Sequence, residues 1–173
     1  MKFKNTKLYD VVLIEPTIFK DDRGSFQESY QFNKFKNNGI ELPFVQDNLV
    51  FSKKNVLRGL HFQNKNEQGK LVRVLQGEIL DVAVDIRKNS PTYGNWISEK
   101  LNDENQYQLY IPPGFAHGYL VLSKTALVYY KCTNIYYPEY ECGIIWNDSF
   151  IGVKWGIENP ILSEKDSKLN ILQ

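Results

Sequence analysis

Histidine is scarce in this sequence, with only His61 and His117 among 173 residues. Zinc sites in proteins are built mostly from several histidine, cysteine and carboxylate side chains. Two histidines far apart in the chain could bind zinc only with help from carboxylates. A metal centre is therefore not expected, and each histidine has to be considered for other roles.

Cysteine is equally scarce, since the chain has only Cys132 and Cys142. Two cysteines do not make a disulfide framework, which favours a reduced protein of the cytoplasm. The first residues carry charges without an apolar core behind them, so no signal peptide is predicted. No apolar run approaches the length of a membrane span. The net charge of +1 gives no reason to expect nucleic-acid or membrane binding.

Several motifs of common enzyme classes are missing. The chain contains no Walker sequence, no dinucleotide glycine fingerprint and no Gly-Xaa-Ser-Xaa-Gly elbow. Mononucleotide-dependent, NAD-dependent and serine-hydrolase readings therefore lose support.

Aromatic residues are abundant, at 14% of the chain, and together with β-branched residues they favour sheet over helix. Short apolar runs alternate with turn signals throughout, which predicts a mostly β sandwich or barrel forming one domain over residues 1–173. Pro16 predicts a bend, residues 21–24 a turn, and residues 33–39 a short helix. The tail is predicted to end in a second short helix.

Residues 70–86 contain two apolar runs around Gln76-Gly77-Glu78, which predict a β-hairpin. Strand alternation in the second run places apolar and polar side chains on different faces. Leu80, Val82, Val84 and Ile86 share one face, and Asp81, Ala83 and Asp85 share the other.

The stretch "VLRGLHFQN" places a histidine in a predicted strand. Alternation puts Gly59, His61 and Gln63 on one small, polar face, which is typical of a cavity wall, where a neutral histidine can act as a general base. The alternative to a general base is a buried histidine that hydrogen-bonds a carbonyl group and takes no part in chemistry. Arg58 would face the other way unless the strand bulges, and Gly59 is the place where a bulge could form.

Polar side chains also share faces in other predicted strands. Tyr130, Cys132 and Tyr136 alternate along one strand and could form a polar cavity wall, or the tyrosines could simply fill a barrel. Gln46 shares a face with Asn48, and Phe26 shares one with Glu28. Lys70 opens a strand, where a solvated edge lysine is the usual case.

Long motifs occur in an order that identifies a family. They are "NVLRGLHFQ", "GKLVRVLQGEILDVAVDIRKNSPTYGNW", "IPPGFAHGYLVLS", "YKCTN", "WND" and "LSEKD". From about Leu13 to about Asp166, the sequence resembles the dTDP-4-dehydrorhamnose 3,5-epimerase family. This resemblance implies a cupin-like jelly-roll with short peripheral helices, no metal, no cofactor and a homodimer. It also implies inversion of both carbons beside the C4 ketone of a dTDP-linked 4-keto-6-deoxyhexose.

The resemblance also implies roles for individual residues. His61 corresponds to the base, Asp166 to its carboxylate partner and Tyr130 to the acid on the opposite face of the sugar, with Lys70 near the enolate oxygen. Substrate-binding positions correspond to Phe19, Arg23, Phe26, Glu28, Gln46, Asn48, Arg58, His117 and Tyr136, of which Arg58 and His117 would line the sugar and phosphate region.

The sequence departs from the family pattern around Ile135 and Tyr137-Pro138, which loosens the assignment of Tyr136. Three other functions stay open at this point. The chain could be a relative that inverts one carbon of a different deoxysugar, a non-catalytic binding protein for nucleotide sugars, or a metal-dependent enzyme with a cupin fold.

Overall fold

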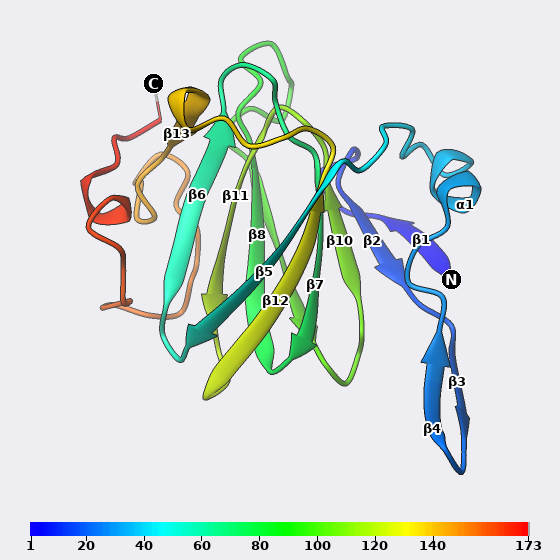
Figure 1. Cartoon of the computed structure of the whole chain (residues 1–173). Helices are drawn as coiled ribbons and strands as arrows, with labels where there is room; N and C mark the ends of the chain where they lie inside the picture. The colour runs from blue at the N-terminus through cyan, green and yellow to red at the C-terminus, as the bar shows by residue number, and fades with distance from the viewer. Residues whose placement is uncertain (173) are drawn as a thin grey trace.

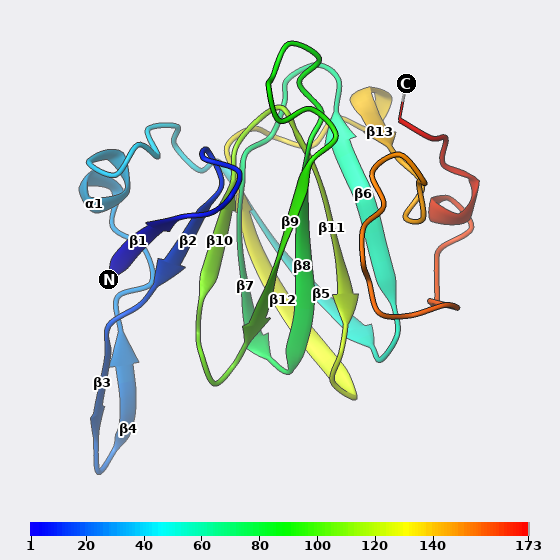
Figure 2. The ribbon, with the colours of Figure 1, turned by 180° about the vertical axis from the view of Figure 1, so that it is seen from behind.

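The computed structural model describes residues 1–172 and consists mainly of two β-sheets packed face to face (Figures 1 and 2). The strands of the larger sheet are β1 (Lys2–Asn5), β2 (Val12–Glu15), β5 (Gln46–Lys53), β7 (Lys70–Gln76), β10 (Gln108–Ile111) and β12 (Thr125–Cys132). Those of the smaller sheet are β6 (Leu57–Gln63), β8 (Glu78–Asp85), β9 (Trp96–Asn102), β11 (Phe115–Val121) and β13 (Glu141–Gly143).

The order in the six-stranded sheet is β1-β2-β10-β7-β12-β5, and in the five-stranded sheet it is β13-β6-β11-β8-β9. Neighbours in both sheets are antiparallel, and most are distant in sequence. The expected mostly β, jelly-roll-like sandwich is confirmed.

A separate two-stranded hairpin, formed by β3 (Ile18–Asp21) and β4 (Gly24–Gln27), projects away from the sandwich (Figure 1). It begins directly after Pro16, where a bend was predicted, and turns at residues 22–23, within the predicted turn. An isolated hairpin is only marginally stable in water, so this one needs a surface to pack on.

The helices are shorter than predicted. α1 spans Phe32–Lys36 rather than 33–39, because the chain leaves the helix at the cap Asn37 and Gly39 adopts a positive φ of 84°. In the tail, the predicted helix is a single 3-10 turn, η2 (Asp166–Lys168), and another such turn is η1 (Pro138–Tyr140). Within residues 1–172, no helix is long and apolar enough to cross a membrane.

The predicted hairpin over residues 70–86 is wrong, because β7 and β8 belong to different sheets. β7 pairs with β10 and β12, whereas β8 pairs with β9 and β11. The chain turns between them at Gly77, whose φ is 84° and where a Cβ would lie 2.1 Å from the carbonyl oxygen of Thr125. Two adjacent apolar runs predict two strands, but they do not say which strands pair.

Apolar side chains from both sheets form the main core, which includes Val72, Val128 and Ala83. The outer face of the five-stranded sheet is also buried, because the C-terminal segment packs Ile151 and Trp155 against it. The alternation predicted for β8 therefore separates two buried faces. Its apolar face lies under the C-terminal segment, and its face with Asp81 points between the sheets.

A β-bulge interrupts the pairing of β6 with β11. His117 pairs with His61 and Tyr119 pairs with Arg58, so one residue of β11, Gly118, lies opposite two residues of β6, Gly59 and Leu60. Since His117 and Tyr119 share a face of β11, their partners His61 and Arg58 point to that same side. The bulge lies at Gly59, where the sequence allowed for one, and the φ of this glycine is 122°.

Gly118 is expected to be essential for this bulge, because a Cβ there would lie 2.7 Å from the carbonyl oxygen of Arg58 and 3.1 Å from the Cα of Gly59. Both neighbours are backbone, so Gly118→Ala should cost about 3 kcal/mol of unfolding free energy, as overpacking does. Urea denaturation measures this loss. Ser25→Ala on the exposed hairpin is the control and should change it by less than about 0.5 kcal/mol. Equal urea midpoints for Gly118→Ala and Ser25→Ala would show that β6 and β11 can move apart at this point without loss of stability.

Candidate active site

A cavity of about 230 Å³ opens between the two sheets, where β6 and β12 end and β5 and β7 begin. Six of the catalytic and substrate-binding residues expected from the family resemblance line it: Gln46, Asn48, His61, Lys70, Tyr130 and Tyr136. They come from both sheets and from the loop after β12. The topology therefore brings together side chains that are up to 90 residues apart, as in the hydrogen bond from the Tyr136 backbone to Gln46.

His61 reaches the cavity from β6 and is held from behind by Asp166 of η2. Its Nε2 lies 2.6 Å from Asp166 Oδ1, and the side chains are 28% and 5% exposed. Burial alone would raise the pKa of the Asp166 carboxyl, but the hydrogen bond and charge of His61 hold that pKa below its ordinary value. The Asp166 carboxylate therefore accepts a hydrogen bond from Nε2–H of His61, and Nδ1 is left as the basic nitrogen.

Tyr130 lies across the cavity from His61, on β12 of the other sheet. Burial raises the pKa of its hydroxyl to about 12, so the hydroxyl keeps its proton near neutral pH. A protonated hydroxyl on the opposite wall can donate a proton to the far face of a ligand held between the two residues.

Lys70 is a cavity residue and not a solvated edge lysine, because β7 is an inner strand of its sheet. It is the register partner of Cys132 on β12. Burial lowers the pKa of its ammonium. In the described part of the chain the Lys70 ammonium makes no hydrogen bond or ion pair, so its N–H donors are available to a ligand.

His117 lies beneath the cavity rather than in its wall. Its Nε2 is 2.7 Å from Asp81 Oδ1, and the two side chains are 7% and 0% exposed. Burial lowers the pKa of His117, although Asp81 pulls it upward. Arg58, the other residue expected near the sugar and phosphate, bonds Ser52 through Nε at 3.1 Å.

Amide side chains form the cavity wall on β5. Gln46 donates to Asn48 at 3.0 Å and accepts the backbone N–H of Tyr136 at 2.8 Å. On β6, Gln63 accepts the backbone N–H of Tyr137 at 2.8 Å. Both glutamines therefore fix the loop that carries Tyr136, even though that loop departs from the family pattern.

Three residues expected at the nucleotide lie on the projecting hairpin. Phe19 and Phe26 face each other across β3 and β4 and are 60% and 69% exposed, and Arg23 pairs with Asp21 at the turn. The hairpin extends away from the sandwich in both views (Figures 1 and 2). Within one chain, these residues do not line the cavity.

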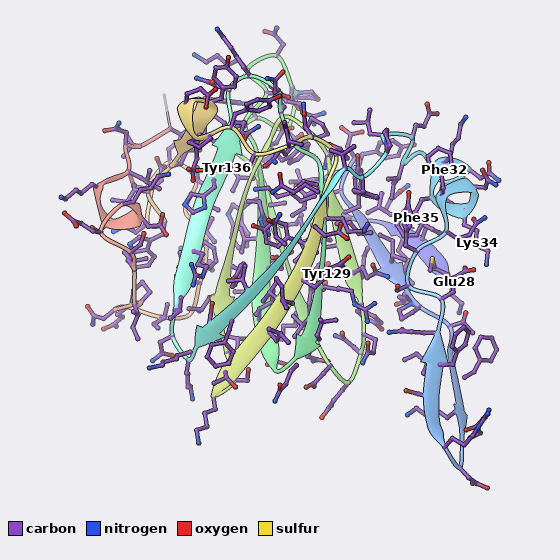
Figure 3. All side chains as sticks on the ribbon, in the orientation of Figure 1. Glu28, Phe32, Lys34, Phe35, Tyr129 and Tyr136 are labelled. Carbon is purple, nitrogen blue, oxygen red and sulfur yellow. The ribbon has the colours of Figure 1, made fainter. Side chains whose placement is uncertain are left out.

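Glu28 is also separated from the cavity. Its carboxylate pairs with Lys34 of α1 at 2.6 Å. Figure 3 shows both beside α1, while Tyr136 lies at the other side of the molecule near the end of β6. The expected nucleotide residues therefore form two groups, one in the cavity and one on the N-terminal segment.

Some site residues carry little signal in the sequence around them. Glu141 of β13 lines the cavity, accepts from the Tyr136 hydroxyl and pairs with Lys165. Nothing in its local pattern marks it, because its strand is short and follows a loop. Asp81 did carry a signal, since an aspartate within an apolar strand needs a partner when it is buried.

The described residues, 1–172, contain no group of three or more histidine, cysteine, aspartate or glutamate side chains placed to hold a metal ion. Each histidine is paired with an aspartate. The cavity combines a histidine base, a protonated tyrosine and an unpaired ammonium, and this set is suited to moving protons on a polar ligand.

Comparison with known proteins agrees with this chemistry. The family model described as dTDP-4-dehydrorhamnose 3,5-epimerase matches residues 5–173. A dTDP-4-dehydrorhamnose 3,5-epimerase of Methanothermobacter thermautotrophicus is 52% identical over 168 residues, which are 95% of this chain and 91% of that protein.

Solved structures are similar over nearly the whole chain. A dTDP-6-deoxy-D-glucose-3,5-epimerase of Legionella pneumophila, in complex with dTDP-4-keto-L-rhamnose, has a TM-score of 0.96 at 47% identity, covering 99% of this chain and 92% of that one. A 3'-monoepimerase of Streptomyces bikiniensis in complex with dTDP-quinovose has a TM-score of 0.91 at 29% identity, covering 97% and 86%. By its family match and these identities, the chain belongs to the dTDP-4-dehydrorhamnose 3,5-epimerase family.

Proposed function

We propose that this chain inverts C3 and C5 of dTDP-4-dehydro-6-deoxy-D-glucose and produces dTDP-4-dehydro-L-rhamnose, a step of dTDP-L-rhamnose biosynthesis. The observation that carries the proposal is the placement of His61 and Tyr130 on opposite walls of one cavity. The 52% identity to an epimerase of that name supports the same reaction.

The reaction begins with removal of a proton from a carbon next to the ketone. Such a proton is weakly acidic in water, so a positioned base is needed. His61 fits this role, because Asp166 accepts a hydrogen bond from Nε2–H and orients the ring so that Nδ1 is free. The same carboxylate stabilises the imidazolium that forms, as in hydrolytic triads.

Inversion requires a proton to return on the opposite face of the sugar. One side chain cannot easily serve both faces, so a second group is needed across the ring. Tyr130 belongs to the other sheet and keeps its proton near neutral pH, because burial raises its pKa to about 12. Once His61 has lost its added proton and Tyr130 has regained one by exchange with water, the same two transfers at the second carbon give the doubly inverted product.

Lys70 is placed to stabilise the enolate oxygen, where negative charge develops. Its ammonium has no partner among residues 1–172 and lies in the cavity with both proton-transfer groups. A cation in a cavity with little water is more effective than one in bulk solvent. The ketone itself accepts the electrons, so this chemistry requires no redox cofactor.

A homodimer is part of the proposal. Phe19 and Phe26 are exposed on the projecting hairpin (Figure 1), and Leu49 and Phe51 are each 61% exposed on the outer face of β5. A second copy that covers such apolar surface would give the hairpin a place to pack. The hairpin would then deliver Arg23 and the two phenylalanines to the nucleotide in the partner's cavity.

We also propose one domain and a cytoplasmic location. The two sheets share one core, which supports a single domain. Both cysteines are free thiols, as is usual in a reducing compartment. The balanced net charge of +1 supports a small-molecule substrate rather than nucleic acid or a membrane surface.

A second candidate function is inversion at a single carbon, favoured by the similarity to a 3'-monoepimerase. Proton NMR in deuterated water, with dTDP-4-keto-6-deoxyglucose as substrate, separates the two functions. Deuterium at both C3 and C5 supports the double epimerase, and deuterium at one carbon supports the alternative. The absence of deuterium at either carbon would contradict both.

His61→Asn is expected to reduce epimerisation about 100- to 10,000-fold, because it removes the base. The same NMR assay measures this loss, and thermal unfolding checks that the variant is folded. Substantial deuterium exchange at C3 and C5 in a folded His61→Asn protein would mean that another group removes the protons.

Tyr130→Phe is expected to slow inversion about 100-fold while proton exchange at one carbon is less affected, because His61 can still remove and return a proton on its own face. Product formation and deuterium content, followed together, separate the two effects. An inversion rate equal to that of the wild type would remove Tyr130 from the mechanism.

Subunit mixing tests whether the β3–β4 hairpin of one subunit acts in the cavity of its partner. Chains with His61→Asn and chains with Arg23→Ala and Phe26→Ala should each be inactive alone. In a co-expressed mixture, half of the dimers are mixed, and one of the two cavities in each has both an intact base and an intact hairpin. About a quarter of wild-type activity should return, by statistical pairing. If no activity returns although mixed dimers form, the hairpin does not act in the partner's cavity.

A further inference from the structure

Two histidine–aspartate pairs lie next to each other in the five-stranded sheet. His61 and His117 are direct register partners across β6 and β11, and Asp166 and Asp81 are their respective carboxylates. The mechanism above uses only the first pair. Because the rings are neighbours, the protonation state of His117 bears directly on the ability of His61 to accept a proton.

The second pair is more deeply buried than the first. The side chains of His117 and Asp81 are 7% and 0% exposed, compared with 28% for His61. Asp81 Oδ2 has no hydrogen-bond partner in the described chain, so His117 is the group that satisfies this carboxylate. A buried carboxylate accepts hydrogen bonds and donates none, so the imidazole nitrogen that faces it must carry a hydrogen.

The surroundings of His117 disfavour a second hydrogen on the ring. Burial is the main cause that lowers its pKa, and the nearby Lys70 and His61 lower it further, while Asp81 opposes them. The Tyr119 ring also packs nearby, at 6.4 Å between centroids. A neutral imidazole has one N–H, and here the 2.7 Å contact with Asp81 assigns it to Nε2.

We propose that Asp81 is a positioning residue that holds His117 as a neutral imidazole with its hydrogen on Nε2. Nδ1 of His117 is then a fixed hydrogen-bond acceptor, and His61 is the imidazole that takes the substrate's proton. An acceptor binds a hydroxyl group of the hexose, whereas ketone and phosphate oxygens need a donor. On the basis of the proposed function, a direct contact of His117 with the substrate is therefore expected to be with a sugar hydroxyl and not with a ketone or phosphate oxygen.

Nitrogen NMR tests the tautomer directly, because the chain has only two histidines. Protein labelled with ¹⁵N in the imidazole ring should show His117 with hydrogen on Nε2 and none on Nδ1, from about pH 6 to about pH 8. The Asp166→Asn variant assigns the signals, since it should change the His61 ring and leave the His117 tautomer as it is. A His117 ring protonated on Nδ1 would overturn the proposal.

Asp81→Asn tests the positioning role. Asparagine can accept through Oδ1 or donate through Nδ2, so it no longer dictates which nitrogen of His117 carries the hydrogen. We expect a signal from Nδ1–H to appear and kcat to fall about 10- to 100-fold, as when other carboxylates that orient an imidazole are changed. A wild-type kcat in this variant would show that the pair is only structural.

His117→Gln is a second variant, for use if Asp81→Asn does not fold. Glutamine can donate to Asp81 through Nε2 and offers Oε1 as an acceptor in place of Nδ1, whereas His117→Lys can donate to Asp81 but has no acceptor. The acceptor role therefore predicts that kcat falls about 10- to 100-fold in His117→Lys and less in His117→Gln. A wild-type kcat in His117→Lys would contradict the acceptor role. The two proposals fail in different ways. A wild-type protein that does not epimerise the dTDP-linked ketosugar contradicts the proposed function, whereas the nitrogen spectrum tests the tautomer without any substrate.

Discussion

The extra residue of β6 opposite β11 determines what the cavity contains. In a regular strand, Arg58 and His61 would lie on opposite faces, because they are three residues apart. The bulge at Gly59 turns both to the space between the sheets, with His61 at the cavity and Arg58 bonded to Ser52. The close approach of β6 and β11 that permits this depends on glycine in both strands, as the 2.5 Å from a Gly59 Cβ to Gly118 shows.

The charges of the site are divided between the two sheets. The five-stranded sheet supplies both histidines and Asp81, with Asp166 coming from η2 beside it, and the six-stranded sheet supplies Lys70 and Tyr130. Proton acceptance is thus confined to one wall, and proton donation and positive charge to the other. This separation suits a reaction in which the ketosugar loses a proton on one face and the planar enolate that forms gains one on the other.

Much of this arrangement could be predicted from sequence, because its signals are local. Alternation identified the polar face with His61 and the strand with Tyr130, and family motifs joined them to Asp166. Strand pairing could not be predicted, as the β7–β8 corner shows, since pairing depends on partners far away in the chain. Glu141 and the separation of Glu28 from the cavity are also long-range features, with no trace in the residues beside them.

The placement of Tyr130 and His61 on different sheets has a further consequence. Sheets in sandwiches pack about 10 Å apart, at a distance set by the side chains between them. Here those side chains include Val72, Val128 and Ala83, which belong to the core against which Tyr130 packs and which fix how far apart the two walls stand. The hydrophobic core therefore also sets the distance between the acid and the base, and a change of one methyl group within it alters that distance.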